Sequence, residues 1–255
     1  MVTNYLAEIL PNREGLAVQN LRAISDGWET DVYSFTLAWR SAGRVQKEDL
    51  ILRIFPGVAS QERAAQEAQV LAWLSRAGYP VPRVHRFDSI ERSPFQKPCL
   101  LMERIHRHSL HGLLFGTSPG NYQKYLPIFC GLLARLHAID WRPLVPGPQT
   151  YEPSSPYPVI EDALKQGAAY FQRCSPPGFF PAWNWILARQ HNIASEGPVL
   201  THMDFHSMNI LVKDRPDPNG QNEVVTDWTS ASLTDYRFDR ASTLMMVGAD
   251  EGWGF

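Results

Sequence analysis

Residues 200–240 read LTHMDFHSMNILVKDRPDPNGQNEVVTDWTSASLTDYRFDR, and they contain the strongest functional signal in the chain. Residues 209–213 and 223–227 have the apolar and β-branched composition of two short strands. The segment between them, residues 214–220, is rich in Asp, Pro, Asn and Gly, which are the residues that form turns. The pattern therefore predicts an antiparallel β-hairpin.

The open end of this hairpin brings polar side chains together. The first residue of one antiparallel strand lies beside the last residue of its partner, so we expect Asn209 next to Asp227. Asp204 comes shortly before Asn209 and leads into the same end. In phosphoryl transfer one carboxylate orients the acceptor hydroxyl and takes its proton, while a second carboxylate and an amide oxygen hold Mg2+. The spacing His202-x-Asp204-x4-Asn209, then Asp227, is that of the catalytic loop and metal-binding aspartate of protein kinases.

The first hundred residues have the pattern of a small antiparallel sheet with one helix. Three short runs have strand-like composition: residues 32–37, 50–55 and 98–103. Residues 40–49 are polar and contain a glycine, which suits a hairpin loop. Residues 60–77 change to helical spacing, with Ser60 as a candidate N-cap. We expect this part of the chain to end near Ile105.

The rest of the chain is predicted to be mainly helical. Residues 122–139 form an amphipathic pattern, and residues 161–173 and 183–194 suggest two further helices. Residues 141–158 contain six prolines and are expected to form a loop. The predicted fold class is α+β with two lobes: an N-terminal sheet-and-helix lobe over residues 1–105, and a helical lobe over residues 106–255.

Composition excludes several classes of protein. Hydrophobic residues make up 44% of the chain and charged residues 20%, as in soluble globular proteins. The formal charge of −2 disfavours a nucleic-acid partner, because there is no basic excess to neutralise phosphates. No apolar stretch approaches the roughly 18 residues of a membrane span, and the start MVTNYLAEIL lacks a signal-peptide pattern. The three cysteines have no metal-like spacing. We expect a cytoplasmic protein without nucleic-acid or membrane partners.

With these motifs the chain resembles the aminoglycoside phosphotransferase/choline kinase-like family of small-molecule kinases, which have a protein-kinase-like fold. The segments HMDFHSMN and DWT match the family's pattern of His, Asp, four spacers and Asn, followed by Asp-Trp or Asp-Phe. The resemblance implies that Asp204 is the catalytic base and that Asn209 and Asp227 hold Mg2+. His202 is interpreted as a structural residue that steadies the loop. Asp239, in the segment DYRFD, is implied to support the catalytic loop.

The resemblance also implies the parts of a nucleotide site in the first half of the chain. Gly27 lies in DGWETDV, where the family has its nucleotide-covering turn, and Glu29 and Thr30 are interpreted as plain turn residues. Arg53 occupies the place of the phosphate-binding lysine, and Glu67 would be its ion-pair partner. Glu103 and Ile105 belong to a hinge that offers backbone groups to adenine. The implied cofactors are ATP and Mg2+, with GTP as the other nucleotide considered.

The implied partner is a small molecule with an acceptor hydroxyl. From Leu200 to the C-terminus there are nine acidic and four basic residues, a balance that would attract a cationic acceptor such as an aminoglycoside or an amino alcohol. Solvated surface charges explain the same balance equally well. No segment of activation-loop length follows Asp227, which disfavours a protein substrate.

Departures from the family pattern keep a second interpretation open, that of a nucleotide-binding pseudokinase or a truncated kinase. Arg53 replaces a lysine, and Met203 and Met208 stand where glycine is common. The chain ends 28 residues after Asp227, whereas the family is expected to continue with further helices. The apolar residues 244–247 should then pack on an earlier helix or lie exposed and favour association. The intact acidic motif favours an active enzyme.

A metal-dependent hydrolase is the third interpretation. His202, Asp204 and His206 alternate, and alternate residues of a strand can ligate one metal ion. Such a site needs a further His or Asp cluster, and none has motif-like spacing. This reading is therefore the least favoured.

Overall fold

The computed structural model describes residues 2–24, 30–106, 108–115, 121–144, 161, 164–165, 167–169, 171, 173, 177–192, 194, 197–212 and 222–252. They belong to two compact units, Met1–Leu133 with Asp204–Ala231, and Ala134–Met203 with Ser232–Phe255. Gly27, most of the proline-rich segment and the hairpin turn lie outside the described residues. The predicted lobe boundary at Ile105 lies within the first unit, and the bounds 1–105 and 106–255 stay a prediction.

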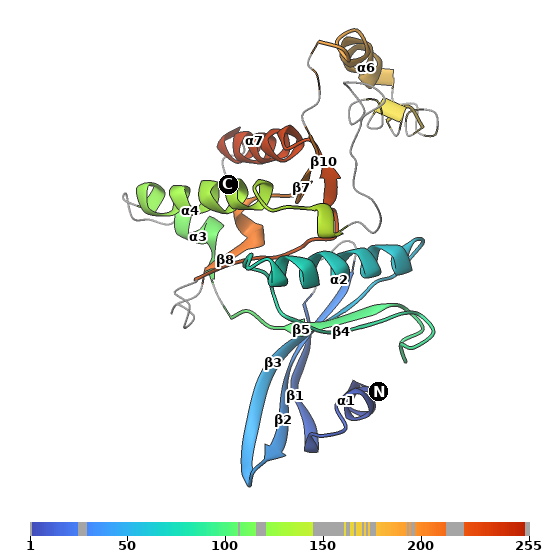
Figure 1. The fold of residues 1–255 in the computed structure, drawn as a ribbon, viewed down its shortest axis with the longest axis vertical. Coiled ribbons are helices and arrows are strands. Elements are labelled where there is room, and N and C mark those ends of the chain that lie inside the picture. The colour runs from blue at the N-terminus through green and yellow to red at the C-terminus, as the bar shows by residue number, and fades with distance from the viewer. Residues whose placement is uncertain are drawn as a thin grey trace. The chain divides into compact units, whose positions relative to one another are not determined.

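A five-stranded antiparallel sheet forms the centre of the first unit (Figure 1). Its strands, in their order across the sheet, are β1 (Glu14–Ile24), β2 (Asp31–Ser41), β3 (Arg44–Ile54), β5 (Cys99–Glu103) and β4 (Val84–Asp88). The three predicted runs coincide with parts of β2, β3 and β5, and only Phe55 and Pro98 lie one residue outside the strands. β1 and β4 lack a strong apolar pattern, because most of β1 is exposed to solvent.

The predicted loop over residues 40–49 is wrong. β2 and β3 continue through this segment and pair as far as Ser41 and Arg44. Only Ala42 and Gly43 form the turn, with positive φ values of 48° and 74°, as a tight two-residue hairpin requires. The polarity of the segment reflects the exposed outer ends of both strands rather than a loop.

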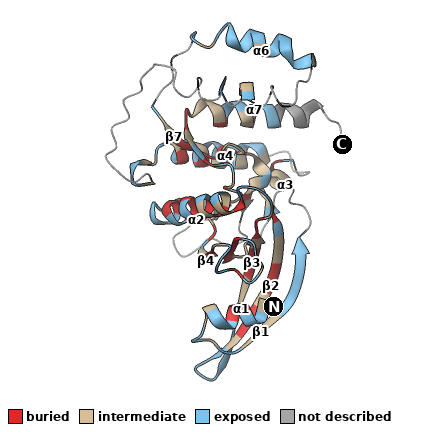
Figure 2. Cartoon of the chain, turned by 90° about the vertical axis from the view of Figure 1, so that its right-hand side faces the viewer, coloured by how far each residue is buried: buried red, intermediate tan, exposed pale blue. Residues whose placement is uncertain are grey.

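One hydrophobic core cluster of the first unit lies on the face of the sheet covered by helix α1 (Val2–Ile9). Tyr5 and Leu6 of α1 join a buried cluster with alternate residues of three strands: Phe35, Leu37, Leu50, Leu52, Ile54, Cys99 and Leu101. Successive strand residues point to opposite faces, so Ile51 and Arg53 point away from this core. Buried segments of the strands are visible beside α1 in Figure 2.

Helix α2 (Ser60–Arg76) confirms the predicted helix but not its predicted cap. The residue before the helix is Ala59, in the left-handed conformation with φ 56°, and no side chain caps the helix start. The buried face repeats at helical spacing through Ala64, Ala68 and Leu71. Glu67 lies in the middle of this apolar stripe, where a carboxylate requires a partner to compensate for lost hydration.

The predicted catalytic hairpin is present in the first unit with shorter strands. β8 (Ile210–Val212) pairs with β9 (Glu223–Val225), and β6 (His108–Ser109) pairs with the other edge of β8. The short helix α3 (Leu110–Leu114) follows β6, and a single 3-10 turn, Ser207–Asn209, precedes β8.

In this hairpin Asn209 faces Thr226 rather than Asp227. The Thr226 backbone amide donates to the Asn209 carbonyl at 2.8 Å, one step beyond the pair formed by Ile210 and Val225. Asp227 follows one residue later, so the expected juxtaposition is shifted by one position.

The second unit is mainly helical in its described residues. Helix α4 (Asn121–His137) begins in the first unit, and β7 (Val199–Thr201) pairs with β10 (Ser232–Thr234). The predicted helix over residues 183–194 begins earlier and is shorter, as α6 (Phe180–Leu187). Short 3-10 turns occur at Arg142–Leu144 and Pro177–Phe179. In α7 (Arg237–Gly252) the side chains of Leu244 to Met246 are exposed.

The fold class is confirmed as α+β, with an antiparallel N-terminal sheet that carries a helix. Among the helices in the described part of the chain, none is long and apolar enough to cross a membrane.

Tyr5 ties α1 to the far strand of the sheet. Its hydroxyl donates to Asp88 Oδ2 at 2.6 Å, and Asp88 is 1% exposed. Burial, followed by this hydrogen bond, raises the pKa of Tyr5 well above its usual value, so the hydroxyl stays a donor. Asp88 Oδ1 is separately bound by Arg86.

Replacing Tyr5 with phenylalanine is expected to lower the free energy of unfolding by about 1 to 3 kcal/mol, because a buried carboxylate oxygen loses its hydrogen bond. Urea denaturation measures this change. Tyr33→Phe is the matched control, since the half-buried Tyr33 hydroxyl bonds to no described residue. Equal stability of the two variants would contradict the assigned role of Tyr5.

Candidate active site

Asp239 accepts hydrogen bonds from the backbone just before Asp204. It lies in the first turn of α7 and is fully buried. Its carboxylate accepts hydrogen bonds from the backbone amides of His202 at 3.0 Å and Met203 at 2.7 Å, and it lies 2.9 Å from His137 Nε2. Met203 is held at a φ of 66°, a conformation that needs such support. His202 and Asp239, each predicted to be a structural residue, are therefore hydrogen-bonded to each other within the second unit.

Asp204 and Asn209 form a second contact, within the first unit. Asn209 Nδ2 donates to Asp204 Oδ2 at 3.1 Å and to the Asp204 carbonyl at 3.0 Å. His206 Nε2 lies 3.4 Å from the same carboxylate oxygen and 3.2 Å from Asn209 Nδ2. The Asp204 side chain is nevertheless 44% exposed, so it is oriented by its neighbours and open to a reactant.

Arg53 and Glu67 form the predicted ion pair. Arg53 Nη1 donates to Glu67 Oε1 at 2.5 Å, and Glu67 is 1% exposed. Burial raises the pKa of Glu67 to about 7, while the charge of Arg53 opposes this rise. The Thr229 hydroxyl and the Trp228 backbone amide also hydrogen-bond to this carboxylate. Glu67, on α2, thus anchors the arginine on the sheet face from which its side chain projects.

Asp227 adopts a left-handed backbone conformation with φ 64°. The next residue, Trp228, is fully buried, donates from its ring to the Val225 carbonyl at 3.0 Å, and packs edge-on against Tyr79. This anchor turns the Asp227 side chain outward, where it is 49% exposed. Strained backbone of this kind is concentrated at functional sites.

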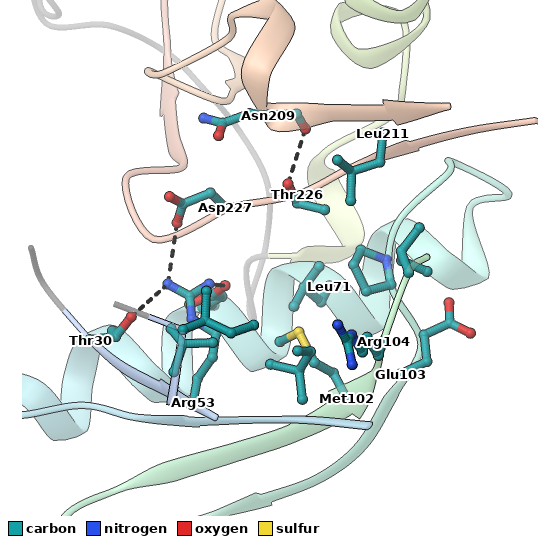
Figure 3. Close-up of a pocket in the computed structure, with 16 residues that line it drawn as sticks. Thr30, Arg53, Leu71, Met102, Glu103, Arg104, Asn209, Leu211, Thr226 and Asp227 are labelled. Atoms are coloured by element: carbon teal, nitrogen blue, oxygen red, sulfur yellow. Dashed lines mark hydrogen bonds and ion pairs between the residues drawn. The ribbon is translucent and has the colours of Figure 1, made fainter. Parts of the chain in front are cut away.

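A cavity of about 410 Å3 in the first unit joins these groups (Figure 3). Its polar lining includes Arg53, Glu67, Asn209 and Asp227. Its apolar lining comes from strand residues and α2: Ile24, Val32, Ile51, Leu71, Met102 and Leu211. Ile51 and Arg53 reach it because they lie on the sheet face opposite the core. In Figure 3 the Asn209 and Asp227 side chains extend to the same side of the cavity, with Arg53 below them.

The predicted hinge also lines this cavity. The amide of Glu103 donates to the Arg83 carbonyl at 3.0 Å, and the amide of Arg104 donates to the Asp49 carbonyl at 2.9 Å. The Ile105 amide makes no hydrogen bond to any described residue, although Ile105 lines the cavity. Of these amides, that of Ile105 is thus the one left for a ligand.

Most of the predicted site residues thus come together. Arg53, Glu67, Asn209, Asp227, Glu103 and Ile105 line one cavity, and Asp204 is hydrogen-bonded to Asn209. Gly27 lies outside the described residues.

Sequence reasoning missed the roles of two polar side chains, Thr30 and Thr229, and considered His206 only as a candidate metal ligand. Thr30 was expected to be a plain turn residue, yet its hydroxyl accepts from Arg53 Nη2 at 3.3 Å. Thr229 bonds to the same Arg53 nitrogen at 3.1 Å. Its place two residues after Asp227 is the signal that could have found it, whereas Thr30 has no comparable signal.

The side-chain oxygens of Asn209 and Asp227 are suitable ligands for a hard cation. Asn209 directs its Nδ2 to Asp204, which leaves Oδ1 as an acceptor, and Asp227 presents an exposed carboxylate. Mg2+ prefers one or two such oxygen ligands together with nucleotide phosphates. In the described part of the chain, no three His, Cys, Asp or Glu side chains gather as a metal site.

Comparison with known proteins identifies the class. The model of the phosphotransferase enzyme family (APH) matches residues 20–254, so the chain belongs to this family. The resemblance seen in the motifs is thereby confirmed, and the chain is a phosphotransferase by family.

Solved structures share the fold at low sequence identity. The GDP and kanamycin complex of APH(2")-IIIa aligns with a TM-score of 0.63 and 13% identity, over 96% of this chain and 77% of that one. A putative aminoglycoside phosphotransferase from Ralstonia eutropha JMP134 gives 0.60 and 16%, over 95% and 69%. The streptomycin–ATP ternary complex of APH(2")-IIa gives 0.59 and 14%, over 92% and 73%. No curated protein matches the chain.

Proposed function

We propose that this protein transfers the γ-phosphoryl group of ATP to a hydroxyl group of a small molecule. The observation that carries the proposal is the shared cavity, in which the Arg53–Glu67 ion pair lies beside Asp227 and opposite a hinge with an available amide. Phosphoryl transfer depends mainly on positioning and electrostatic stabilisation, which this arrangement can supply.

The adenine ring would occupy the apolar part of the cavity. Met102 and Leu211 offer flat apolar contact, and the Ile105 amide can donate to a ring nitrogen. The phosphates would then extend toward Arg53, whose fixed positive charge is held by Glu67. Solved structures that share the fold are complexes with GDP and ATP, which supports nucleotide binding by this chain.

Asn209 and Asp227 would hold Mg2+ through Oδ1 of the amide and the exposed carboxylate. When bound, the cation neutralises charge on the phosphates. Asp204 would accept the proton of the acceptor hydroxyl, because its carboxylate is exposed and its orientation is set by Asn209 and His206.

For the acceptor we propose a cationic molecule of the aminoglycoside or amino-alcohol type. The excess of acidic residues after Leu200 would attract it, and proteins that share the fold bind kanamycin and streptomycin. We also propose that the protein works in the cytoplasm, where ATP is available, and that GTP is the alternative donor.

One observation favours a second candidate function, a nucleotide-binding protein without catalysis. Arg53 stands in the place of the phosphate-binding lysine and also contacts Asp227 at 3.3 Å, so it engages the residue proposed to hold the metal. A planar guanidinium does not replace an ammonium ion without adjustment.

An ATP-consumption screen with Mg2+ tests the proposal. We expect sustained turnover with at least one hydroxyl compound among aminoglycosides, amino alcohols, macrolides and sugars. Parallel calorimetry with ATP separates the two candidates. Nucleotide binding without turnover on any acceptor would favour the binding protein, and absence of nucleotide binding would reject both.

A further inference from the structure

The Thr229 hydroxyl links two residues that the proposed function treats separately. Its Oγ1 donates to Asp227 Oδ1 at 2.8 Å and accepts from Arg53 Nη2 at 3.1 Å. It also lies 3.5 Å from Glu67 Oε2. One half-buried hydroxyl therefore touches the carboxylate proposed to hold the metal and the cation proposed to hold the phosphates.

The arginine at position 53 has a larger and less symmetric cationic group than a lysine, and this group must be oriented by hydrogen bonds. The guanidinium is a planar fork with five N–H donors, whereas a lysine ammonium is a compact charge with three. Arg53 Nε is buried and has no hydrogen-bond partner in the described residues, so the described hydrogen bonds of the guanidinium are made by Nη1 and Nη2. Glu67 holds Nη1, and Nη2 reaches the hydroxyls of Thr30 and Thr229 and the carboxylate of Asp227.

Thr229 also orients the Asp227 carboxylate in a way that suits the binding of a cation. The hydroxyl and Arg53 Nη2 both bond to Oδ1 of Asp227, while Oδ2 receives no hydrogen bond from a described residue. The carboxylate is thereby oriented through one oxygen and left open through the other. A carboxylate ligand fixed by an outer hydrogen bond holds its metal better than an unsupported one.

We propose that Thr229 is a positioning residue that adapts this site to an arginine in place of lysine. Its hydroxyl sets the Nη2 arm of Arg53 and the carboxylate of Asp227 as one unit before nucleotide binds. The inference rests on the proposed function for its role in nucleotide binding, but the link itself is present without nucleotide.

A double-mutant cycle between Thr229→Val and Arg53→Lys tests the proposal. In the protein with Arg53, Thr229→Val is expected to weaken Mg-ATP binding about tenfold, since a hydrogen bond to a charged group is lost. In the Arg53→Lys background the same change should weaken binding by a clearly smaller factor, because the Nη2 arm is absent and only the hydrogen bond from Thr229 to Asp227 is lost. Calorimetry measures Kd, and turnover at saturating ATP shows whether kcat changes less than binding.

Two further variants control the cycle. Thr229→Ser keeps the hydroxyl and is expected to restore Kd to the wild-type value. Ser230→Ala is the matched control, because the neighbouring Ser230 is exposed and hydrogen-bonds to no described residue. Where Thr229→Val does not fold, Thr229→Ala takes its place. An equal loss of affinity in the Arg53 and Arg53→Lys backgrounds would overturn the proposal.

Melting temperatures without nucleotide keep this test separate from the proposed function. If the link exists, Thr229→Val lowers Tm more in the Arg53 protein than in the Arg53→Lys background. Additive losses of Tm would overturn the link, even in a protein that binds nucleotide. Conversely, a coupled loss of Tm in a protein that binds no nucleotide would support the link while the proposed function fails.

Discussion

Replacing Asp204 with asparagine is expected to lower the turnover number by about 10^2 to 10^4-fold while the affinity for Mg-ATP stays almost unchanged. The amide has nearly the same shape and can still accept the hydrogen bond from Asn209 Nδ2, so the loop keeps its geometry. It cannot take a proton from the acceptor hydroxyl. A loss confined to turnover indicates a role in the transition state rather than in binding.

Steady-state kinetics and calorimetry on the same preparation test this expectation. Asp140→Asn is a suitable control, because Asp140 is an exposed aspartate that likewise bonds to a neighbouring side chain, Arg142. Wild-type turnover in Asp204→Asn would mean that another group takes the proton. A large loss of nucleotide affinity would instead assign Asp204 to the nucleotide site.

The sequence pattern predicts the fold best where local periodicity and burial agree. Helix α2 begins at the predicted residue and ends one residue early, since its apolar stripe repeats at helical spacing over the whole segment. The strands β2, β3 and β5 have buried apolar runs that show the same agreement. β1 escapes prediction because it is largely exposed, so its composition is not constrained by a core.

The local sequence pattern predicts the hairpin that carries the site residues, but it does not predict the register in which the two strands pair. Both strands are predicted, yet Asn209 belongs to a 3-10 turn, and the strand register gives it Thr226 rather than Asp227 as its backbone partner. One residue of shift changes which side chains share a face. Strand-like composition does not reveal such a turn, because the same residues suit either conformation.

The contacts around Arg53 lie beyond what the sequence can predict. Its order before Glu67 suggests an ion pair only through the family resemblance. Thr30 and Thr229 are 23 and 176 residues from Arg53, and their hydroxyls meet Nη2 only because the sheet and the segment that follows β9 converge. A threonine in a turn has many local uses, so neither position is distinctive before the fold is known.

Removing the Asp227 carboxylate is expected to abolish the Mg2+-dependent part of nucleotide binding, a loss of about 100-fold or more in affinity. Wild-type protein with Mg-ATP at about 100 times Kd should gain roughly 2.7 kcal/mol of stability, seen as a rise in melting temperature. Asp227→Ala should show almost none of this rise.

Asp227→Asn separates loss of the charge from damage to the turn. The position has a φ of 64°, which asparagine tolerates better than alanine, and the amide oxygen can still accept from Thr229. Because the fold is kept, the affinity of this variant for ATP measured in EDTA should match that of the wild type. The increase in ATP affinity on adding Mg2+ should be lost. A gain from Mg2+ that survives in both variants would show that Asp227 is not the principal ligand. It would also remove the reason for treating the Asn209–Asp227 end of the cavity as the phosphate end, since the cation and the phosphates must meet at one point.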